Sequence, residues 1–292
     1  MKITIGIPAY NEEKNIAPII TKLKKITDSI IVCDDGSSDM TSKISQDLGA
    51  RVVTHEKNMG YGAAIKSIFL EAKQIQPDIL VTFDADGQHN VEDIEKVIEP
   101  VQKSTSDIVI GSRFLNKKNK EIPRYRKVGI KTITGLTNTL TGTKISDAQS
   151  GFRAYSKKTL KKITPSDDGM GVSTEILIKS SKLGLIITEV PIKVNYEGDT
   201  STHDPISHGT SVILSTLKFT SIHNPLKFYG IPGLVFLIIG LGFVAWTIQI
   251  YSVEQEIITN ISLIGIGCIV LGSIFLMTAV ILFSIVTVVK EK

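Results

Sequence analysis

Short apolar runs alternate with amphipathic segments along the first hundred residues of the chain. The runs of β-forming residues lie at 3–8, 29–34, 51–55 and 79–84. Stretches with helical periodicity follow them at 12–26, from about 37, at 60–75 and at 91–102. Because each helical stretch connects one strand to the next, the order predicts an α/β fold, an open and mostly parallel sheet with helices on both faces.

Two long apolar segments dominate the C-terminal part of the chain. Residues 228–250 and 261–289 contain no Lys, Arg, Asp or Glu, and each exceeds the roughly 20 residues that a helix needs to cross a bilayer. The preceding segment, 198–227, is polar and then weakly amphipathic, which indicates an interfacial helix. We therefore expect a globular domain over 1–197, an interfacial linker, and a two-helix transmembrane anchor over 228–292.

The charges that flank these spans predict their orientation. The basic residues near the two outer ends are Lys218, Lys227, Lys290 and Lys292, whereas the connector 251–260 carries two glutamates and no basic residue. By the positive-inside rule both termini are cytosolic, and the first ten residues do not resemble a secretory signal. We expect an integral protein of the cytoplasmic membrane with its large domain in the cytosol.

The net charge of +4 is mildly basic and suits a protein that rests on anionic lipid headgroups. Nucleic-acid binding requires a clustered basic stripe with aromatic residues. Only segment 116–127, NKKNKEIPRYRK, approaches that pattern. We interpret it as a solvated loop and predict membrane lipid, and no nucleic acid, as a partner.

Polar residues gather where the predicted strands end. The clusters are PAYNE, CDDGSSD, THEKNMGYGAA and DADGQH, in chain order. The carboxyl ends of parallel strands share one edge of the sheet, which is where ligands bind. Asp84 and Asp86 point to the same side because alternate strand residues do, and their like charges repel unless a cation joins them. With Gln88 as a further oxygen ligand, the pattern predicts a Mg²⁺ or Mn²⁺ site that holds a diphosphate.

Two other interpretations of the same segment remain open. Asn90 is a suitable N-cap for the helix that follows it. The segment also matches a calcium-binding loop in part, but His89 stands where that loop needs glycine, and a strand instead of a helix precedes it.

Six motifs in register, PAYNE, CDDGSSDMT, NMGYGAA, DADGQH, GSRF and SGFRAYSK, resemble the family 2 glycosyltransferases. The resemblance covers about residues 1–196 and is greatest to the polyprenyl-phosphate (dolichyl-phosphate) sugar synthases, with a tail similar to an archaeal branch. It implies a GT-A fold and inverting transfer of one sugar from a nucleotide sugar to a polyprenyl phosphate at the cytosolic face. The lipid-linked monosaccharide would then serve glycosylation.

The resemblance also implies a role for individual residues. Those expected to contact the nucleotide are Pro8, Tyr10, Glu12 and Asp35. Those expected to bind metal and donor diphosphate are Asp84, Asp86 and Gln88. The arginines expected to bind the acceptor phosphate are Arg113 and Arg126, with Arg124 as the alternative to Arg126. Ser150 and Arg153 are expected near the sugar or in the loop that closes over it.

The acceptor is the least determined part of this interpretation. Asp147 and Glu175 are possible general bases for a hydroxyl acceptor, or structural partners of Arg153 or Lys179. A phosphate monoester is mostly a dianion at pH 7 and needs no base. The alternatives are therefore a transferase to a glycolipid or polysaccharide hydroxyl, a non-catalytic membrane scaffold, and, remotely, a soluble nucleotidyltransferase.

Several further features stay open at this level. The donor is UDP- or GDP-linked, with UDP slightly favoured by the tail. Segment 196–205 is acidic and neutral where many relatives carry a basic residue, so a phosphate contact is not carried over to it. The lone histidines, His55, His203 and His208, have no metal spacing and suit a solvated loop or a donor pocket. Small residues in the spans offer close-packing surfaces for a homo-oligomer, namely Gly240, Gly242, Gly265 and Gly267.

Overall fold

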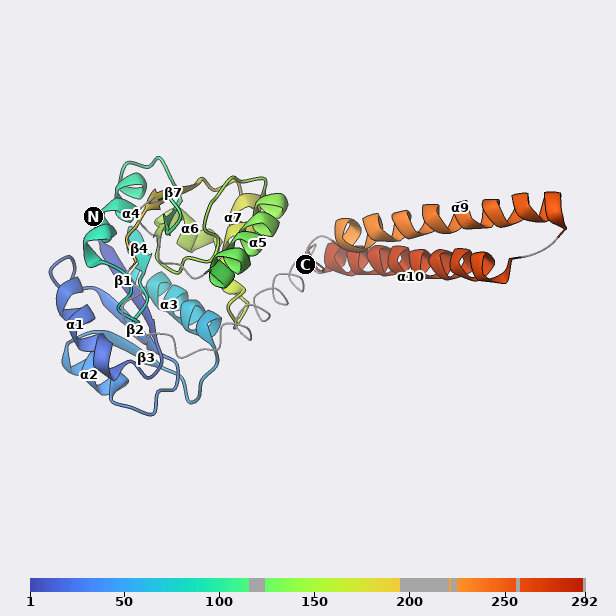
Figure 1. Cartoon of the computed structure of the whole chain (residues 1–292). Helices are drawn as coiled ribbons and strands as arrows, with labels where there is room; N and C mark the ends of the chain where they lie inside the picture. Colours follow the sequence, from blue (N-terminus) through green and yellow to red (C-terminus); the bar gives the residue numbers. More distant parts are fainter. Residues whose placement is uncertain (116–123, 195–220, 222–224, 256–257, 291–292) are drawn as a thin grey trace. The chain divides into compact units, whose positions relative to one another are not determined.

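The computed structural model describes the chain except residues 116–123, 195–220, 222–224, 256–257 and 291–292 (Figure 1). It divides into two compact units, Met1–Thr216 and Leu217–Lys292. Most of the expected interfacial linker, and two of the lone histidines, His203 and His208, lie outside the described residues.

The first unit is built on a seven-stranded mixed sheet. Its strands are β1 (Ile3–Ala9), β2 (Ile30–Asp34), β3 (Arg51–Thr54), β4 (Ile79–Thr82), β5 (Ile108–Ser112), β6 (Arg153–Ser156) and β7 (Ile187–Pro191). Their order across the sheet is β3-β2-β1-β4-β6-β5-β7. Four of the six neighbouring pairs are parallel, and only β6 runs antiparallel to its neighbours β4 and β5. The prediction of a mostly parallel sheet is confirmed.

Helices cover both faces of this sheet, as predicted (Figure 1). They are α1 (Glu13–Leu23), α2 (Thr41–Asp47), α3 (Tyr61–Ile75), the 3₁₀ turn η1 (Val91–Asp93), α4 (Ile94–Gln102), α5 (Arg124–Thr141), α6 (Lys157–Lys162) and α7 (Val172–Lys182). One apolar core packs α1 and α4 against the sheet, for example through Ile16 and Val97. A second core packs α3 and α7 against the opposite face, for example through Phe69 and Leu177. Each such buried side chain contributes about 1.5–3 kcal/mol.

The helix expected from about residue 37 begins only at Thr41. The residues before it are held by the loop that follows β1, since the Ser38 amide donates to the Asn11 side-chain oxygen at 2.9 Å. The intervening turn belongs to the ligand-binding edge, and this use of its backbone competes with helix formation.

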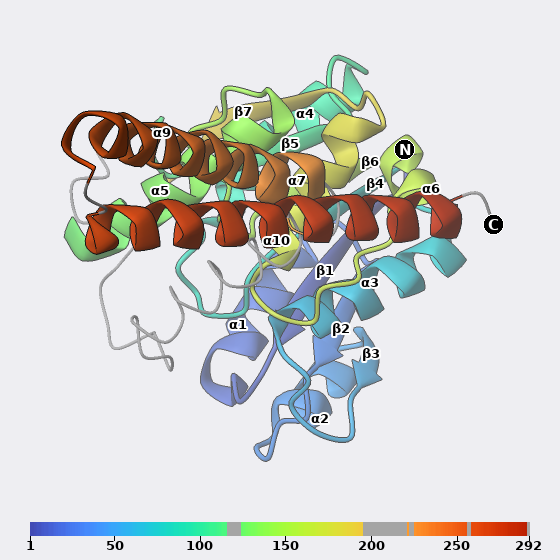
Figure 2. The ribbon, with the colours of Figure 1, turned by 90° about the vertical axis from the view of Figure 1, so that its right-hand side faces the viewer.

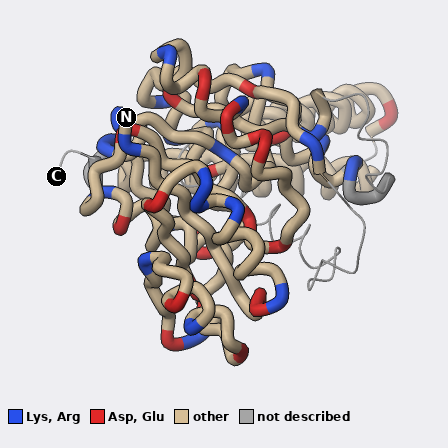
Figure 3. Tube along the Cα trace, turned by 90° about the vertical axis from the view of Figure 1, so that its left-hand side faces the viewer, with Lys and Arg blue, Asp and Glu red and all other residues tan. Residues whose placement is uncertain are grey.

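Charged positions of both signs are interspersed over the first unit (Figure 3). Residues 116–123, the first part of the basic segment that the sequence singles out, are outside the described residues. Its last four residues, 124–127, form the first turn of α5, so the solvated-loop interpretation is wrong for them.

The second unit consists of η2 (Leu226–Gly230), α9 (Ile231–Glu254) and α10 (Thr259–Lys290). The two long helices lie side by side (Figures 1 and 2). By length and composition both could cross a membrane: 18-residue windows within Leu226–Glu254 and Thr259–Val286 have mean hydropathies of 2.3 and 2.7. Because most of their apolar side chains are exposed, they are unlike the core helices of a soluble domain.

Two of the four glycines expected to form packing surfaces serve the contact between α9 and α10. A Cβ on Gly240 would come within 2.9 Å of the Gly265 carbonyl oxygen, so the two backbones approach closely there. A Cβ on Gly242 or Gly267 would instead meet no atom of the described residues within 4 Å. Homo-oligomerisation through them stays a prediction.

Candidate active site

The sheet order brings the loops with the polar motifs to one edge. Strand β1 lies between β2 and β4, with Ala9 opposite Asp34 and Gly6 opposite Thr82. All three strands are parallel, so the PAYNE, CDDGSSD and DADGQH loops leave the sheet at their shared carboxyl end, as predicted.

The first two loops are joined by hydrogen bonds. Asn11 has a φ of 54°, a left-handed conformation that asparagine tolerates well. Its backbone amide donates to the Ser37 hydroxyl at 2.9 Å, and its side-chain oxygen accepts from the Ser38 amide. The Glu12 amide donates to the Thr41 hydroxyl at 2.8 Å. The two predicted nucleotide motifs therefore form one structural unit.

The expected nucleotide residues of the first loop differ in exposure. Pro8 is buried in β1, whereas Tyr10 is exposed at the edge of the sheet. Burial raises the pKa of Glu12, a hydrogen bond from Asn15 lowers it, and the charge of Asp86 raises it further. The charge of Asp86, in the fourth motif, thus acts on Glu12 in the first.

Asp35 holds the loop that precedes α3. Its carboxylate accepts the backbone amides of Met59 at 2.9 Å and Gly60 at 2.8 Å. His55 approaches the same carboxylate with Nδ1 at 2.6 Å and approaches the Ser67 hydroxyl with Nε2 at 2.8 Å. His55, with its side chain 10% exposed, therefore supports this loop, and the solvated-loop interpretation is wrong for it. The nucleotide contact assigned to Asp35 stays a prediction.

Both oxygens of Asp84 are engaged. The Tyr61 hydroxyl donates to Oδ1 at 3.2 Å, and His89 Nε2 lies 3.2 Å from Oδ2. Burial alone raises the pKa of Asp84, but His89, Tyr61 and the charge of Arg113 outweigh it and hold the pKa below its usual value. Burial raises the pKa of Tyr61 well above its usual range, so its hydroxyl remains a donor.

The rest of the DADGQH loop forms a tight turn. Asp86 accepts the backbone amide of Gln88 at 2.9 Å, and Gly87 has a φ of 72° between them. The side chain of Asn90 accepts the Glu92 amide at 3.1 Å and caps η1. The capping interpretation of Asn90 is confirmed.

Asp84 and Asp86 fit a hard divalent cation. Asp84 is ionised at neutral pH, and the charge of Asp86 reaches Glu12. Within the part of the chain that the structure describes, no group of three or more His, Cys, Asp or Glu side chains is arranged to hold a metal. A closed structural zinc site is thus not formed by those residues. Mg²⁺ instead binds through one or two carboxylates and completes its shell with water and substrate phosphates.

Arg113 and Asp147 form a buried bidentate ion pair. Arg113 Nε and Nη2 lie 2.7 and 2.8 Å from the two carboxylate oxygens, and the Arg113 amide donates to the same group at 3.2 Å. Glu189 on β7 in turn accepts the amides of Ser146 and Asp147. Burial alone raises the pKa of Asp147, but Arg113 outweighs it and holds the pKa below its usual value. The partner of Asp147 is Arg113, so the expected pairing with Arg153 or Lys179 is wrong.

Glu175 is also fully engaged. It pairs with Lys179 at 2.5 Å and accepts the amides of Ser166 and Asp167 and the Ser166 hydroxyl. Burial raises its pKa, but these contacts outweigh burial and lower it. Of the two roles expected for Glu175, general base or structural partner of a basic residue, the structure shows the pairing with Lys179.

Arg153 supports a loop from inside the protein. It is 1% exposed, and its guanidinium donates to the carbonyl oxygens of Ser150 at 2.8 Å, Ala148 at 2.7 Å and Ser173 at 2.9 Å. The Ser150 hydroxyl is buried, without a hydrogen-bond partner among the described residues. The structure thus shows Arg153 positioning the loop before β6. Direct contact of Ser150 or Arg153 with the sugar stays a prediction.

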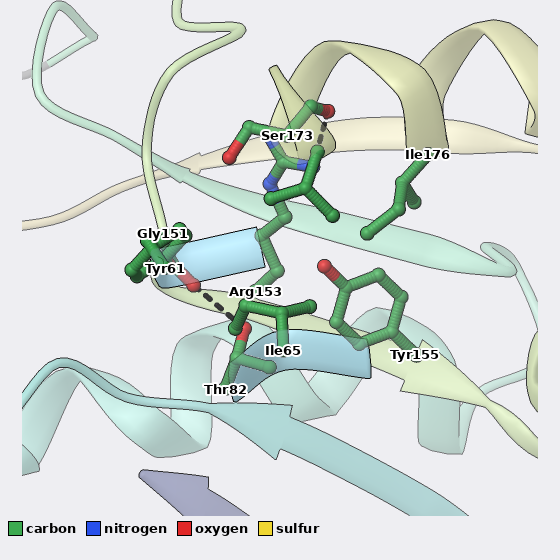
Figure 4. Close-up of a pocket in the computed structure, with 9 residues that line it drawn as sticks. Tyr61, Ile65, Thr82, Gly151, Arg153, Tyr155, Ser173 and Ile176 are labelled. Carbon is green, nitrogen blue, oxygen red and sulfur yellow. Dashed lines mark hydrogen bonds between the residues drawn. The ribbon is translucent and has the colours of Figure 1, made fainter. Parts of the chain in front are cut away.

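A cavity of about 10 Å³ lies beside this guanidinium (Figure 4). Its walls include Tyr61, Thr82, Gly151 and Tyr155. Such a volume holds at most one water molecule, so the cavity is too small for a donor sugar.

Sequence reasoning missed two residues that contact Asp84, namely Tyr61 and His89. Tyr61 and His89 sit inside the NMGYGAA and DADGQH motifs, but no local pattern indicates that both reach Asp84. Arg126 lies in the first turn of α5, and its side chain and that of Arg124 are outside the described residues.

The family model described as Glycosyl transferase family 2 matches residues 4–164, more than half of the chain. The chain belongs to glycosyl transferase family 2. This family 2 glycosyltransferase is 38% identical to the UDP-N-acetylglucosamine–dolichyl-phosphate N-acetylglucosaminyltransferase of Methanococcus voltae, over 73% of the chain and 91% of the relative. It is 31% identical to the dolichyl-phosphate hexose transferase of Haloferax volcanii, over 74% of the chain and 92% of the relative.

A solved structure confirms the fold. Glucosyl-3-phosphoglycerate synthase from Mycobacterium tuberculosis, in complex with Mn²⁺, UDP and glucosyl-3-phosphoglycerate, matches with a TM-score of 0.60. The match covers 74% of this glycosyltransferase and 79% of that chain at 22% identity. At this identity the likeness concerns the GT-A fold, which the motifs predict.

Proposed function

We propose that this glycosyltransferase moves one sugar from a nucleoside-diphosphate sugar to a polyprenyl phosphate such as dolichyl phosphate, with inversion and with a divalent metal. The names of the two archaeal relatives support this acceptor class. The Mn²⁺ and UDP of the solved neighbour support a metal-bound donor. Both UDP and GDP donors fit the proposal.

The choice of a phosphate acceptor rests on one observation: both carboxylates that could act as a general base are already bound by other residues. Asp147 is held by Arg113, and Glu175 by Lys179 and Ser166. The contacts lower the pKa of each carboxylate, which weakens it as a proton acceptor. A hydroxyl acceptor must lose a proton, whereas a phosphate monoester is already mostly a dianion at pH 7. The site therefore favours a phosphate.

The reaction then needs positioning and charge neutralisation. An oxygen of the acceptor phosphate attacks the anomeric carbon, the bond from that carbon to the nucleoside diphosphate breaks, and no proton leaves the acceptor. Bound at Asp84 and Asp86, with Gln88 as a possible further ligand, the metal would supply electrostatic stabilisation of the departing diphosphate. Arg113, held by Asp147 and close enough to lower the pKa of Asp84, would bind the acceptor phosphate beside this site. Its planar guanidinium suits phosphate oxygens.

The membrane-spanning helices suit a lipid acceptor. We place both termini and the first unit on the cytosolic side, because basic residues flank the outer ends of the two spans and are missing from the connector. A polyprenyl chain would then lie in the bilayer, with its phosphate at the cytosolic membrane surface, on the same side as the first unit.

A lipid-labelling assay tests the proposal. The full-length protein in detergent is incubated with Mn²⁺, a polyprenyl phosphate and one of several radiolabelled UDP- or GDP-sugars, and the lipid phase is counted. Matched reactions replace the polyprenyl phosphate by the free polyprenol. We expect label with the phosphate, from one donor, that is lost in an Asp86→Ala variant. Label transferred to the free polyprenol instead would contradict the proposal.

A further inference from the structure

The Asp84 carboxylate is held from two sides by residues of different elements. Tyr61, the first residue of α3, donates to one oxygen, and His89, from the loop after β4, reaches the other. Each contact measures 3.2 Å. Because the torsion that rotates a carboxylate is soft, two contacts on opposite oxygens restrict it far more than one would.

A third element packs against the same carboxylate, whose side chain stays 24% exposed. A Cβ on Gly151 would lie 2.4 Å from the Tyr61 hydroxyl and 2.7 and 2.8 Å from the two oxygens of Asp84. The Gly151 carbonyl is fixed by the Thr82 hydroxyl at 2.6 Å. Only glycine admits this approach without displacing either side chain.

The supports of Asp84 are themselves rigid. The His89 ring packs against Phe83 and Phe152, with ring centroids 5.8 and 5.2 Å away. Its backbone forms a bridge to Val194, and its side chain is 7% exposed. Tyr61 lines the small cavity beside Arg153 (Figure 4).

We propose that Tyr61 and His89 are positioning residues for the metal and donor diphosphate, which fix the Asp84 carboxylate before the cation arrives. The inference rests on the proposed function, since it assigns the cation to Asp84 and Asp86. Each carboxylate oxygen has two lone pairs, so one hydrogen bond leaves the other lone pair for a cation. Partners that orient a metal ligand in this way typically change metal affinity about 10–100-fold when they are removed.

The test measures Mn²⁺ binding by electron paramagnetic resonance. The full-length protein in detergent is titrated with Mn²⁺ in the presence of UDP, and separately of GDP, without any acceptor. Tyr61→Phe removes one hydroxyl and keeps the ring. Tyr155→Phe is the matched control, because Tyr155 lines the same cavity but shares hydrogen bonds with Thr82 and Arg153. We expect Mn²⁺ affinity to fall about tenfold in Tyr61→Phe and to stay within about twofold in the control.

A second pair of variants examines the other support. His89→Gln keeps an N–H donor on a side chain of suitable length, whereas His89→Leu keeps only the packing. We expect His89→Leu to lose Mn²⁺ affinity and His89→Gln to recover most of it. Melting temperatures of all variants, measured without metal, show whether a loss of affinity reflects loss of fold.

The outcomes separate this inference from the proposed function. If the wild-type protein binds Mn²⁺ and Tyr61→Phe binds it equally well, the positioning role is wrong while the proposed function stands. An equal loss of affinity in Tyr61→Phe and Tyr155→Phe also overturns it, because the effect would then belong to the cavity as a whole. A wild-type protein that binds no Mn²⁺ with either nucleotide overturns both.

Discussion

Replacing Asp147 by asparagine keeps the shape of the side chain and removes its charge from a buried ion pair. The Asp147 side chain is fully buried and Arg113 is 12% exposed. After the change, one of the two former acceptor oxygens becomes an amide donor that faces the donors of Arg113. The arginine is then left buried with an incomplete partner.

The expected cost follows from this burial. Removing one partner of a buried pair typically destabilises a protein by about 3–5 kcal/mol. For a unit of this size, about 1 kcal/mol shifts the melting temperature by about 2–4 °C, so we expect a fall of about 6–20 °C. The matched control is Asp47→Asn, which breaks a pair with Lys43 whose side chains are 61% and 60% exposed. Such surface pairs contribute about 0–1 kcal/mol.

Cys33 offers a probe for unfolding of the first unit alone. It is fully buried in β2, whereas the other cysteine lies in α10. The full-length protein is heated in detergent with an alkylating reagent, and mass spectrometry follows modification of the peptide that contains Cys33. The apparent melting temperature is the midpoint of that modification.

The pH dependence provides an independent check. The folded-state pKa of Asp147 lies below its usual value, so its stabilisation is present above about pH 4 and is lost as the pH falls through the folded-state pKa. The difference between wild type and Asp147→Asn should therefore shrink from pH 7 toward pH 3, with thermal unfolding followed by circular dichroism because alkylation needs the thiolate. A variant within about 1 kcal/mol of wild type at pH 7, or a difference that does not change with pH, would refute the argument.

Three further predictions can be checked with the same preparations. Asp86→Ala should abolish transfer while the melting temperature without metal stays near that of wild type, as measured by lipid labelling and Cys33 modification. Gly62→Ala should destabilise the first unit by about 1–3 kcal/mol, because its Cβ would meet the Asp167 carbonyl oxygen at 2.1 Å, whereas Gly242→Ala, with open space around it, should be neutral in thermal unfolding. Burial, helped by nearby carboxylates, raises the pKa of Cys33 to about 12, so native protein should resist alkylation of Cys33 at pH 8, and rapid modification there would contradict its burial.

The sequence predicts where strands form better than it predicts which strands pair in the sheet. The apolar runs at β1, β2, β3 and β4 are confirmed as strands, and each ends in turn residues. Strands β1, β2 and β4 are buried, whereas β3 is only half-buried at its two valines. The antiparallel strand β6, inserted between β4 and β5, is not anticipated. Its four residues, Arg153–Ser156, carry a buried arginine that serves loop carbonyls, which obscures any strand pattern.

In the candidate site, likewise, the sequence predicts the position of the key carboxylates but not the residues that contact them. The edge that holds Asp84 and Asp86 follows from the βα alternation alone. The partners of these residues do not, since Tyr61 lies 23 positions before Asp84, and Arg113 and Asp147 are 34 apart. Such contacts depend on strand order and loop path, which local periodicity does not encode.

The most direct test of the proposed reaction is the identity of its two products. After incubation with the active nucleotide sugar and a polyprenyl phosphate, mass spectrometry determines the lipid product and the nucleotide released. We predict a polyprenyl monophosphate that has gained one sugar residue, together with the nucleoside diphosphate. A lipid that has gained a second phosphate with the sugar, together with a nucleoside monophosphate, would contradict transfer of the sugar alone.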